Sequence, residues 1–138
     1  MELQLIPGND PLLRLPSQPF DFSSPQCNSW DLAAALEKVM NYFDGFGLSA
    51  IQCGMPLRVF CMRTKPDVTM FNPRLIDVSE QTVTLEEGCL SFPNLTMKVT
   101  RPRIIKVRYT LKDGDTRTTK LDGMTARCFL HEMDHLDG

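Results

Sequence analysis

The sequence predicts an α+β domain with a helix near each end of the chain and short strands between them. Three observations support this prediction. Apolar residues recur at a helical period from Ser29 to Phe43, β-rich segments follow in the middle of the chain, and a second helical stretch runs from about Met124 to Asp137. This order is typical of an α+β domain with its helices on one side of small sheets.

The first predicted helix covers Ser29–Phe43. Its apolar positions lie three or four residues apart and are Leu32, Ala35, Leu36, Val39, Met40 and Phe43. Asn28 or Ser29 can cap its N-terminus, and Asp31 suits the positive end of the helix dipole. Asp44-Gly45 ends this helix, and GFGLSAIQCG follows as a glycine-punctuated turn that leads into an extended stretch.

Strands are predicted where β-branched and aromatic residues cluster between turn residues. The predicted strands are Leu57–Arg63, Glu80–Leu85, Leu95–Val99, Ile104–Leu111 and Thr116–Leu121. A loop containing Asp113-Gly114 joins the last two. Asp122 can cap the final helix, and Gly138 provides its C-terminal stop.

Composition and charge limit the classes of function. The chain has 138 residues, of which 42% are hydrophobic, so one domain (residues 1–138) can bury a core without disulfides. A net charge of −2 with scattered Lys and Arg argues against nucleic acid or an anionic membrane as the main partner. No apolar run approaches the ~20 residues of a membrane span, and Glu2 stands where a signal peptide needs a basic start.

The cysteines indicate a reducing compartment. There are five of them, an odd number, and they lie in apolar contexts. We therefore expect free, mostly buried thiols and a cytoplasmic location.

The chemistry of the chain is concentrated in RCFLHEMDHLDG, which holds both histidines, His131 and His135, on either side of Glu132. On a helix, residues four apart share one face, so both imidazoles can bind one metal ion. Glu132 is rotated away and can reach the attacking water without coordinating the ion. The alternative is a surface helix that contains two histidines by chance.

A third ligand is expected upstream. Only Leu136, Asp137 and Gly138 follow His135, and Asp137 projects from a different face of the helix. Zinc peptidases with this pattern take their third ligand from downstream, so we expect neither a thermolysin-like nor a metzincin site.

Cys89 in LEEGCLSFP is the best upstream candidate, because a thiolate is a strong ligand for zinc or ferrous iron and Gly88 allows a close backbone approach. One Cys and two His leave an open position, as in catalytic sites. The rival is a closed structural Cys₂His₂ site that adds Cys128, three residues before His131. That site would give Glu132 no role.

The block GFGLSAIQ (Gly45–Gln52) has a glycine-rich start but follows a helix and lacks the third glycine of a dinucleotide-binding loop. Gln52 is more informative, because its amide can donate to a developing oxyanion beside the metal. The alternative is a turn followed by one polar residue.

Three blocks together, GFGLSAIQ, EGCLSFP (Glu87–Pro93) and HEMDHLDG (His131–Gly138), closely resemble the three signature motifs of peptide deformylases. They occur in the family's order and at similar spacings. FNP at Phe71–Pro73 and PGNDPLLR near the start also resemble family sequence, so the resemblance covers nearly the whole chain.

The resemblance implies a metal-dependent hydrolase that removes the N-formyl group from the formylmethionine of new polypeptides and releases formate. It implies an α+β fold with antiparallel β-sheets wrapped around a central metal-binding helix. Cys89, His131 and His135 would hold one divalent ion, natively Fe²⁺, with Zn²⁺, Ni²⁺ or Co²⁺ as substitutes. Glu132 would move the proton, and Gln52 with the backbone N–H of Leu90 would stabilise the oxyanion.

The resemblance also implies how substrate binds. Gly47 and the segment around Gly88 would hold the peptide like an added strand. The residues that fall where the family lines its methionine pocket are Phe46, Leu85, Glu87, Cys128 and His131. For Phe46 and Leu85 core packing is the alternative, and Glu87 is better interpreted as a polar support of the pocket.

Three departures from the family pattern stand out. Ser49 replaces the usual alanine, and Arg127 occupies a position that is apolar in some members, so we expect it to point outward or to tune substrate preference. Many members continue past the third motif with an extension that contributes to ribosome docking in bacteria. Either this chain is a short form of the family or the extension has been removed from it. Its expected partners are N-formylmethionyl nascent peptides, and its contact with the ribosome stays open.

Two other functions remain open from the sequence. One is a different metallo-amidase or peptidase that uses the same Cys-His₂ centre. The other is a non-catalytic module stabilised by zinc.

Overall fold

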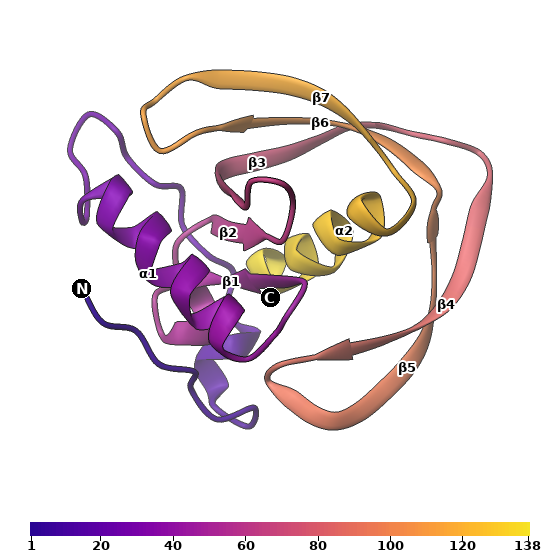
Figure 1. Cartoon of the computed structure of the whole chain (residues 1–138), viewed down its shortest axis with the longest axis horizontal. Helices are drawn as coiled ribbons and strands as arrows, with labels where there is room; N and C mark the ends of the chain where they lie inside the picture. The colour runs from indigo at the N-terminus through magenta and orange to yellow at the C-terminus, as the bar shows by residue number, and fades with distance from the viewer.

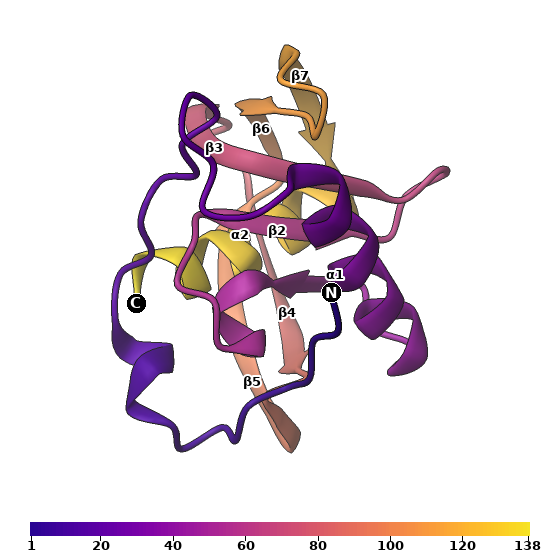
Figure 2. The ribbon, with the colours of Figure 1, turned by 90° about the vertical axis from the view of Figure 1, so that its left-hand side faces the viewer.

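The computed structural model describes the backbone of residues 1–138 and every side chain except that of Pro93. The chain has two short 3₁₀ turns (η) in its N-terminal half, and strands and helices make up the rest of its regular structure (Figures 1 and 2). The elements are, in order, η1 (Pro11–Arg14), α1 (Ser29–Tyr42), β1 (Gly47–Ser49), η2 (Ala50–Cys53), β2 (Val59–Met62), β3 (Val68–Val78), β4 (Thr82–Cys89), β5 (Phe92–Pro102), β6 (Ile104–Thr110), β7 (Thr116–Asp122) and α2 (Gly123–Asp137).

The predicted α+β class is confirmed, and so are both helices. Asn28 caps α1 through a hydrogen bond of 3.0 Å from the backbone N–H of Asp31 to its side-chain oxygen. Asp122 occupies the N-cap position of α2, but its carboxylate pairs with Arg103 rather than with a helix N–H. Within the described residues, no helix is long and apolar enough to span a bilayer.

The strands form one antiparallel sheet in the order β1-β2-β3-β6-β7 and a second antiparallel pair, β4-β5. Because β3 runs on into β4 and β5 runs on into β6, these segments make one long ribbon that bends near Ser79 and Arg103. Figure 1 shows this ribbon passing around α2, with the β4-β5 part on the far side of the helix from α1. The sheets thus enclose the C-terminal helix.

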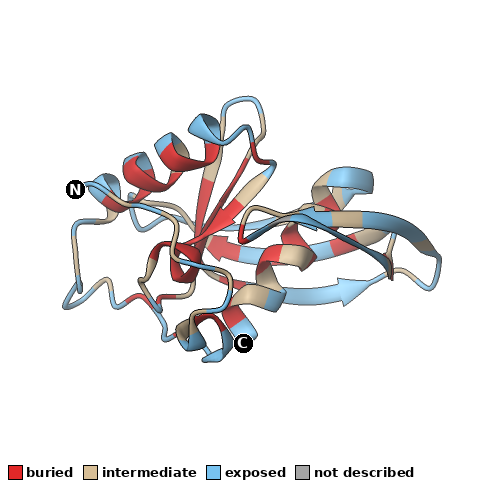
Figure 3. Cartoon of the chain, turned by 90° about the horizontal axis from the view of Figure 1, so that it is seen from below, coloured by how far each residue is buried: buried red, intermediate tan, exposed pale blue. Residues whose placement is uncertain are grey.

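The helices do not lie on one side of the main sheet, so that expectation is wrong. Every residue of β2 is buried, and alternate side chains point to opposite faces. Val59 and Cys61 pack in the core cluster of α1, whereas Phe60 and Met62 pack in the cluster of α2. In Figure 3 the buried residues also gather on the inner face of α1, while its outer face is exposed.

The β3 strand was not predicted, although it is among the longest. Asn72 has a positive φ of 51° and is followed by Pro73, which has no backbone N–H to donate. The register with β6 shifts between Phe71 and Arg74, so the strand continues through a bulge. The predicted strands on β2, β4, β5, β6 and β7 are confirmed in position, but β4 and β5 extend further than expected.

Candidate metal centre

Three ligand-type side chains converge where the β4-β5 turn meets α2. Cys89 ends β4, and His131 and His135 lie one helical turn apart on α2. Their ligand atoms all lie within 4.8 Å of one another, and Cys89 Sγ is 3.3 Å from His135 Nε2. In a tetrahedral site, bonds of about 2.3 Å to sulfur and about 2.0 Å to nitrogen place those atoms about 3.5 Å apart. The three donors therefore fit a first-row divalent ion.

The protonation of the donors is compatible with metal binding. Burial, and then the charge of His131, lowers the pKa of His135 to about 4, so its imidazole is neutral at pH 7. Burial raises the pKa of the Cys89 thiol. A bound cation counteracts that effect, because it stabilises the thiolate directly.

Glu87 holds the ring of His131. Its Oε1 lies 3.0 Å from His131 Nδ1, and its carboxylate receives hydrogen bonds of 2.6 and 2.7 Å from Arg101. Burial raises the pKa of Glu87, but the bonds from Arg101 and His131 outweigh burial and lower it to about 2. An ionised Glu87 accepts a hydrogen bond from the Nδ1–H of His131, so Nε2 keeps its lone pair for a metal.

Glu132 lies in the same site but is oriented differently from the histidines. Only 3% of the residue is exposed, and its Oε1 has no hydrogen-bond partner among the described residues. Burial raises the pKa of Glu132 to about 8. A buried carboxyl with a free oxygen and a pKa near neutrality is suited to accept and return a proton.

Gln52 faces the triad with the donor end of its amide. Its Oε1 accepts hydrogen bonds of 3.0 Å from the Ser49 backbone N–H and 2.9 Å from the Ser49 hydroxyl. Its Nε2 is therefore directed at Ser91 Oγ, 2.9 Å away, and at Cys89 Sγ, 3.4 Å away. Leu90 lies in the turn between Cys89 and Phe92 and lines the cleft beside the triad.

Cys128 does not join the cluster of ligand atoms. Its thiol lies 3.4 Å from the backbone oxygen of Phe46, in position to donate to it. Burial, followed by the charges of Glu132 and Glu87, raises the pKa of Cys128 far above its usual range. A thiol held in this way lies outside the set formed by Cys89, His131 and His135.

A cleft of about 600 Å³ opens beside the triad. The predicted site residues that line it are Phe46, Gly47, Gln52, Glu87, Gly88, Cys89, Leu90, Cys128, His131 and Glu132. Within the described part of the chain, Leu85 is not a lining residue and is 42% exposed, so it lies neither in the cleft nor in the core. Phe46 is 69% exposed at the cleft, which is not core packing either.

Gly47 allows the wall of the cleft that β1 forms to approach α2 closely. A β-carbon at this position would lie 2.8 Å from both Cys128 Sγ and Glu132 Oε2. Any side chain there would displace one of these groups, so the block GFGLSAIQ needs this glycine for close packing.

Further lining residues were not assigned from sequence, namely Asp44, Gly45, Met62, Arg63, Thr64, Glu86, Met124 and Thr125. Arg127 also lines the cleft, and the expectation that it points outward is wrong. Its side chain is 7% exposed, and its Nη1 lies 2.6 Å from Glu87 Oε2. The signal that could have found it is the presence of a buried acid, Glu87, that needs cationic partners.

Comparison with known proteins identifies relatives over nearly the whole chain. The profile of the family described as Polypeptide deformylase matches residues 3–138. A peptide deformylase of Rhodopseudomonas palustris (strain BisA53) is 37% identical over 146 residues, covering 99% of this chain and 78% of that protein.

Solved structures agree with the sequence relatives. The crystal structure of peptide deformylase from Thermotoga maritima has a TM-score of 0.92 at 33% identity, covering 99% of this chain and 92% of that one. A probable peptide deformylase from Synechococcus phage S-SSM7 has a TM-score of 0.90 at 35% identity, with coverages of 98% and 94%.

Proposed function

The chain belongs to the polypeptide deformylase family, and on that basis we propose how its residues carry out the family reaction. The reaction is hydrolysis of the N-terminal formamide of formylmethionyl peptides, which releases formate. The observation that carries the proposal is the open Cys-His₂ triad beside a buried carboxyl, Glu132, with a free oxygen.

Cys89, His131 and His135 are proposed to hold one divalent ion, with Fe²⁺ as the native metal and Zn²⁺, Ni²⁺ or Co²⁺ as substitutes. The mixed thiolate and imidazole set supports a divalent first-row ion, because it suits Fe²⁺ and each of these substitutes. When bound, such an ion supplies Lewis-acid chemistry to the formyl group and to the attacking water.

Glu132 is proposed to move the proton. It accepts a proton from the attacking water through its free Oε1 as the new carbon–oxygen bond forms. It then returns that proton to the peptide nitrogen as the carbon–nitrogen bond breaks. The immediate products are formic acid and a peptide with a free N-terminal amine. The acid then passes its proton to the amine, so the released pair is formate and an ammonium group, and the atoms and charges balance.

Gln52 and Leu90 are proposed to stabilise the oxyanion. The amide of Gln52 is already fixed with Nε2 toward Cys89, and it needs no reorientation when charge develops. The N–H of Leu90 would add a second donor from the turn that follows Cys89.

The cleft is proposed to hold the peptide as an extra strand. β1 is an edge strand that pairs only with β2 in the described sheet, and Gly47 is its first residue. Gly88 lies in β4 on the other side of the cleft. The methionine side chain would enter between Phe46 and Cys128, with Glu87 as a polar support behind it. N-formylmethionyl nascent chains are made in the cytoplasm, so we place the activity there, with transient contact to the ribosome.

Formate release from a formyl-Met peptide, measured on Ni²⁺-loaded protein, tests this function. We expect turnover by the wild type and a loss of about 10²–10⁴-fold in Glu132→Gln, with one metal per chain retained in both proteins. A different metallo-amidase would cleave acetyl-Met or unblocked peptides instead. Unfolding of Glu132→Gln on metal removal, with no formate release by the wild type, would support the zinc-stabilised module and contradict the proposal.

A further inference from the structure

The hairpin that supplies Cys89 is not attached to α2 by a hydrophobic core. It forms its own sheet, β4-β5, and its large apolar side chains remain partly exposed. Leu85 is 42% exposed, Leu95 is 53% exposed and Met97 is 62% exposed. Burial of apolar area therefore contributes little to holding this hairpin in place. One end of the hairpin continues into β3 and β6 of the main sheet, and polar contacts to α2 then hold it against the histidines.

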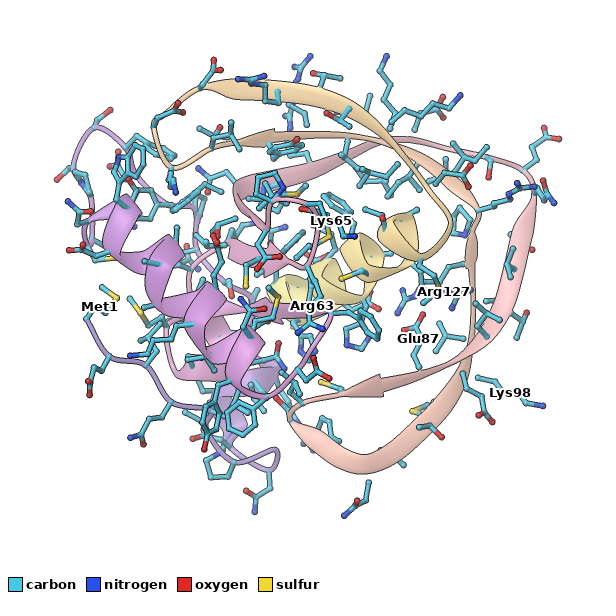
Figure 4. The ribbon with its side chains drawn as sticks, viewed as in Figure 1. Met1, Arg63, Lys65, Glu87, Lys98 and Arg127 are labelled. Carbon is cyan, nitrogen blue, oxygen red and sulfur yellow. The ribbon has the colours of Figure 1, made fainter. Side chains whose placement is uncertain are left out.

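Arg127 makes a buried set of such contacts from α2. Its Nη1 donates to Glu87 Oε2 at 2.6 Å and to the Val99 carbonyl at 3.0 Å, and its Nη2 donates to the Val83 carbonyl. Val83 and Glu87 belong to β4 and Val99 belongs to β5, so one guanidinium joins both strands to the helix. Figure 4 shows Arg127 and Glu87 in the space between α2 and the hairpin.

Other cations near this junction act differently. Arg101 binds Glu87 within the hairpin itself, and its contact to α2 runs to Asp134, whose side chain is 70% exposed. Arg103 pairs with Asp122 over 3.5 Å at an exposed position. Exposed pairs of this kind contribute little, because water screens them. Arg127 provides the buried connection.

We propose that Arg127 is a positioning residue that clamps the β4-β5 hairpin onto α2 and so sets the distance from Cys89 to His131 and His135. The carbonyls of Val83 and Val99 fix the hairpin, and Glu87 passes the constraint to the ring of His131 through its other oxygen. The inference rests on the proposed function only in taking these three residues as the metal ligands.

The guanidinium is needed for its shape as well as its charge. It donates in a fixed plane to three acceptors on two strands, whereas a lysine ammonium offers a single point of attachment on a flexible stem. Arg127→Lys should therefore keep Glu87 paired and the protein folded, while leaving the hairpin less firmly held.

The test uses Co²⁺-loaded full-length protein, with two readouts besides activity. One is the thiolate-to-cobalt absorption band, and the other is the rate of Co²⁺ release to a chelator. For both Arg127→Lys and Arg127→Met we expect a weaker band and release about 10–100-fold faster than in the wild type, because groups that hold metal ligands in place affect affinity by that factor. Arg103→Met is the matched control, with release within about twofold of wild type.

A wild-type band and release rate in Arg127→Lys would overturn the clamp, even if its melting temperature fell. The same result in folded Arg127→Met would also overturn it. If Arg127→Met does not fold, Arg127→Lys decides alone. Failure of the proposed function is seen separately, as an absence of formate release by the wild type while the metal readouts stay intact.

Discussion

At the scale of single residues, Ser49 and Gln52 show how the site fixes the direction of one amide. The Gln52 side chain is 1% exposed, and its oxygen accepts from both the N–H and the hydroxyl of Ser49. If the amide were turned over, its NH₂ group would face the N–H and the hydroxyl of Ser49, and both present hydrogen bonds would be lost. The donor end therefore faces Cys89 and Ser91, where an oxyanion would need it.

This geometry predicts a graded response to two substitutions. Gln52→Leu removes the donor, so we expect kcat to fall about 10²–10³-fold. Ser49→Ala removes the hydroxyl but keeps the backbone N–H that orients the amide, so we expect a loss of less than about tenfold. Steady-state formate release with equal metal loading measures both. Equal losses in the two variants would show that the hydroxyl itself, rather than amide orientation, matters for the reaction.

Residue types and spacing predicted which side chains would meet at the candidate site, because metal ligation and proton transfer need particular groups. Cys89, His131 and His135 do come together, and Glu132 lies beside them. The position of Arg127 could not be predicted in this way. Its environment depends on where β4 and β5 cross α2, and no local pattern encodes that crossing.

At the scale of elements, the N-terminal segment braces the wall that holds the proposed oxyanion donors, Gln52 and Leu90. The backbone N–H of Ile6 donates to the Gln52 carbonyl at 2.9 Å. Gly8 then passes directly over the turn after Cys89, where a β-carbon would lie 2.2 Å from the Ser91 carbonyl oxygen. Figure 2 shows this segment running from the N-terminus along the lower edge of the view, past the end of the β4-β5 hairpin, before it rises toward η1.

Gly8→Ala should therefore disturb the site from outside it. The added methyl group must displace the Ser91 turn, which we expect to cost about 1–3 kcal/mol of stability and to lower kcat more than it changes KM. Gly114→Ala is the control, because Gly114 has a φ of +87° but nothing within 4 Å. It should lose comparable stability, of about 1–2 kcal/mol, with kcat unchanged. Thermal unfolding and formate release distinguish the two, and an unchanged kcat in Gly8→Ala would contradict the bracing role.

The elements with a simple period were predicted, and those that break the period were not. The helix α1 and the strands β6 and β7 match their predicted bounds within a residue. The β3 strand was not predicted, because Asn72-Pro73 is typical of a turn. In the structure these residues form a bulge, and the strand continues on both sides of it. The prediction for β4 stopped at Leu85, four residues too early. Glu87 is a charged residue on the inner face of this strand, so the sequence there does not alternate between polar and apolar residues.

At the scale of the whole molecule, the ribbon of β3, β4, β5 and β6 turns around α2 and brings two distant parts of the chain into one site. Cys89 and His135 are 46 residues apart in sequence, yet their ligand atoms are 3.3 Å apart. One apolar cluster packs between α1, β1 and β2, and a second packs against α2. The candidate metal site lies on the side of α2 that faces the β4-β5 hairpin, where polar contacts replace apolar packing. This arrangement leaves the cleft open to a peptide.

The proposed reaction depends on Cys89, rather than Cys128, as the third ligand of the metal site. The most direct measurement is the Co²⁺ content and the thiolate-to-cobalt absorption band of Cys89→Ala and Cys128→Ala. We predict that Cys89→Ala loses the band and binds Co²⁺ at least about tenfold more weakly, whereas Cys128→Ala keeps the band and one ion per chain. Loss of the band in Cys128→Ala, with the band retained in Cys89→Ala, would contradict the account.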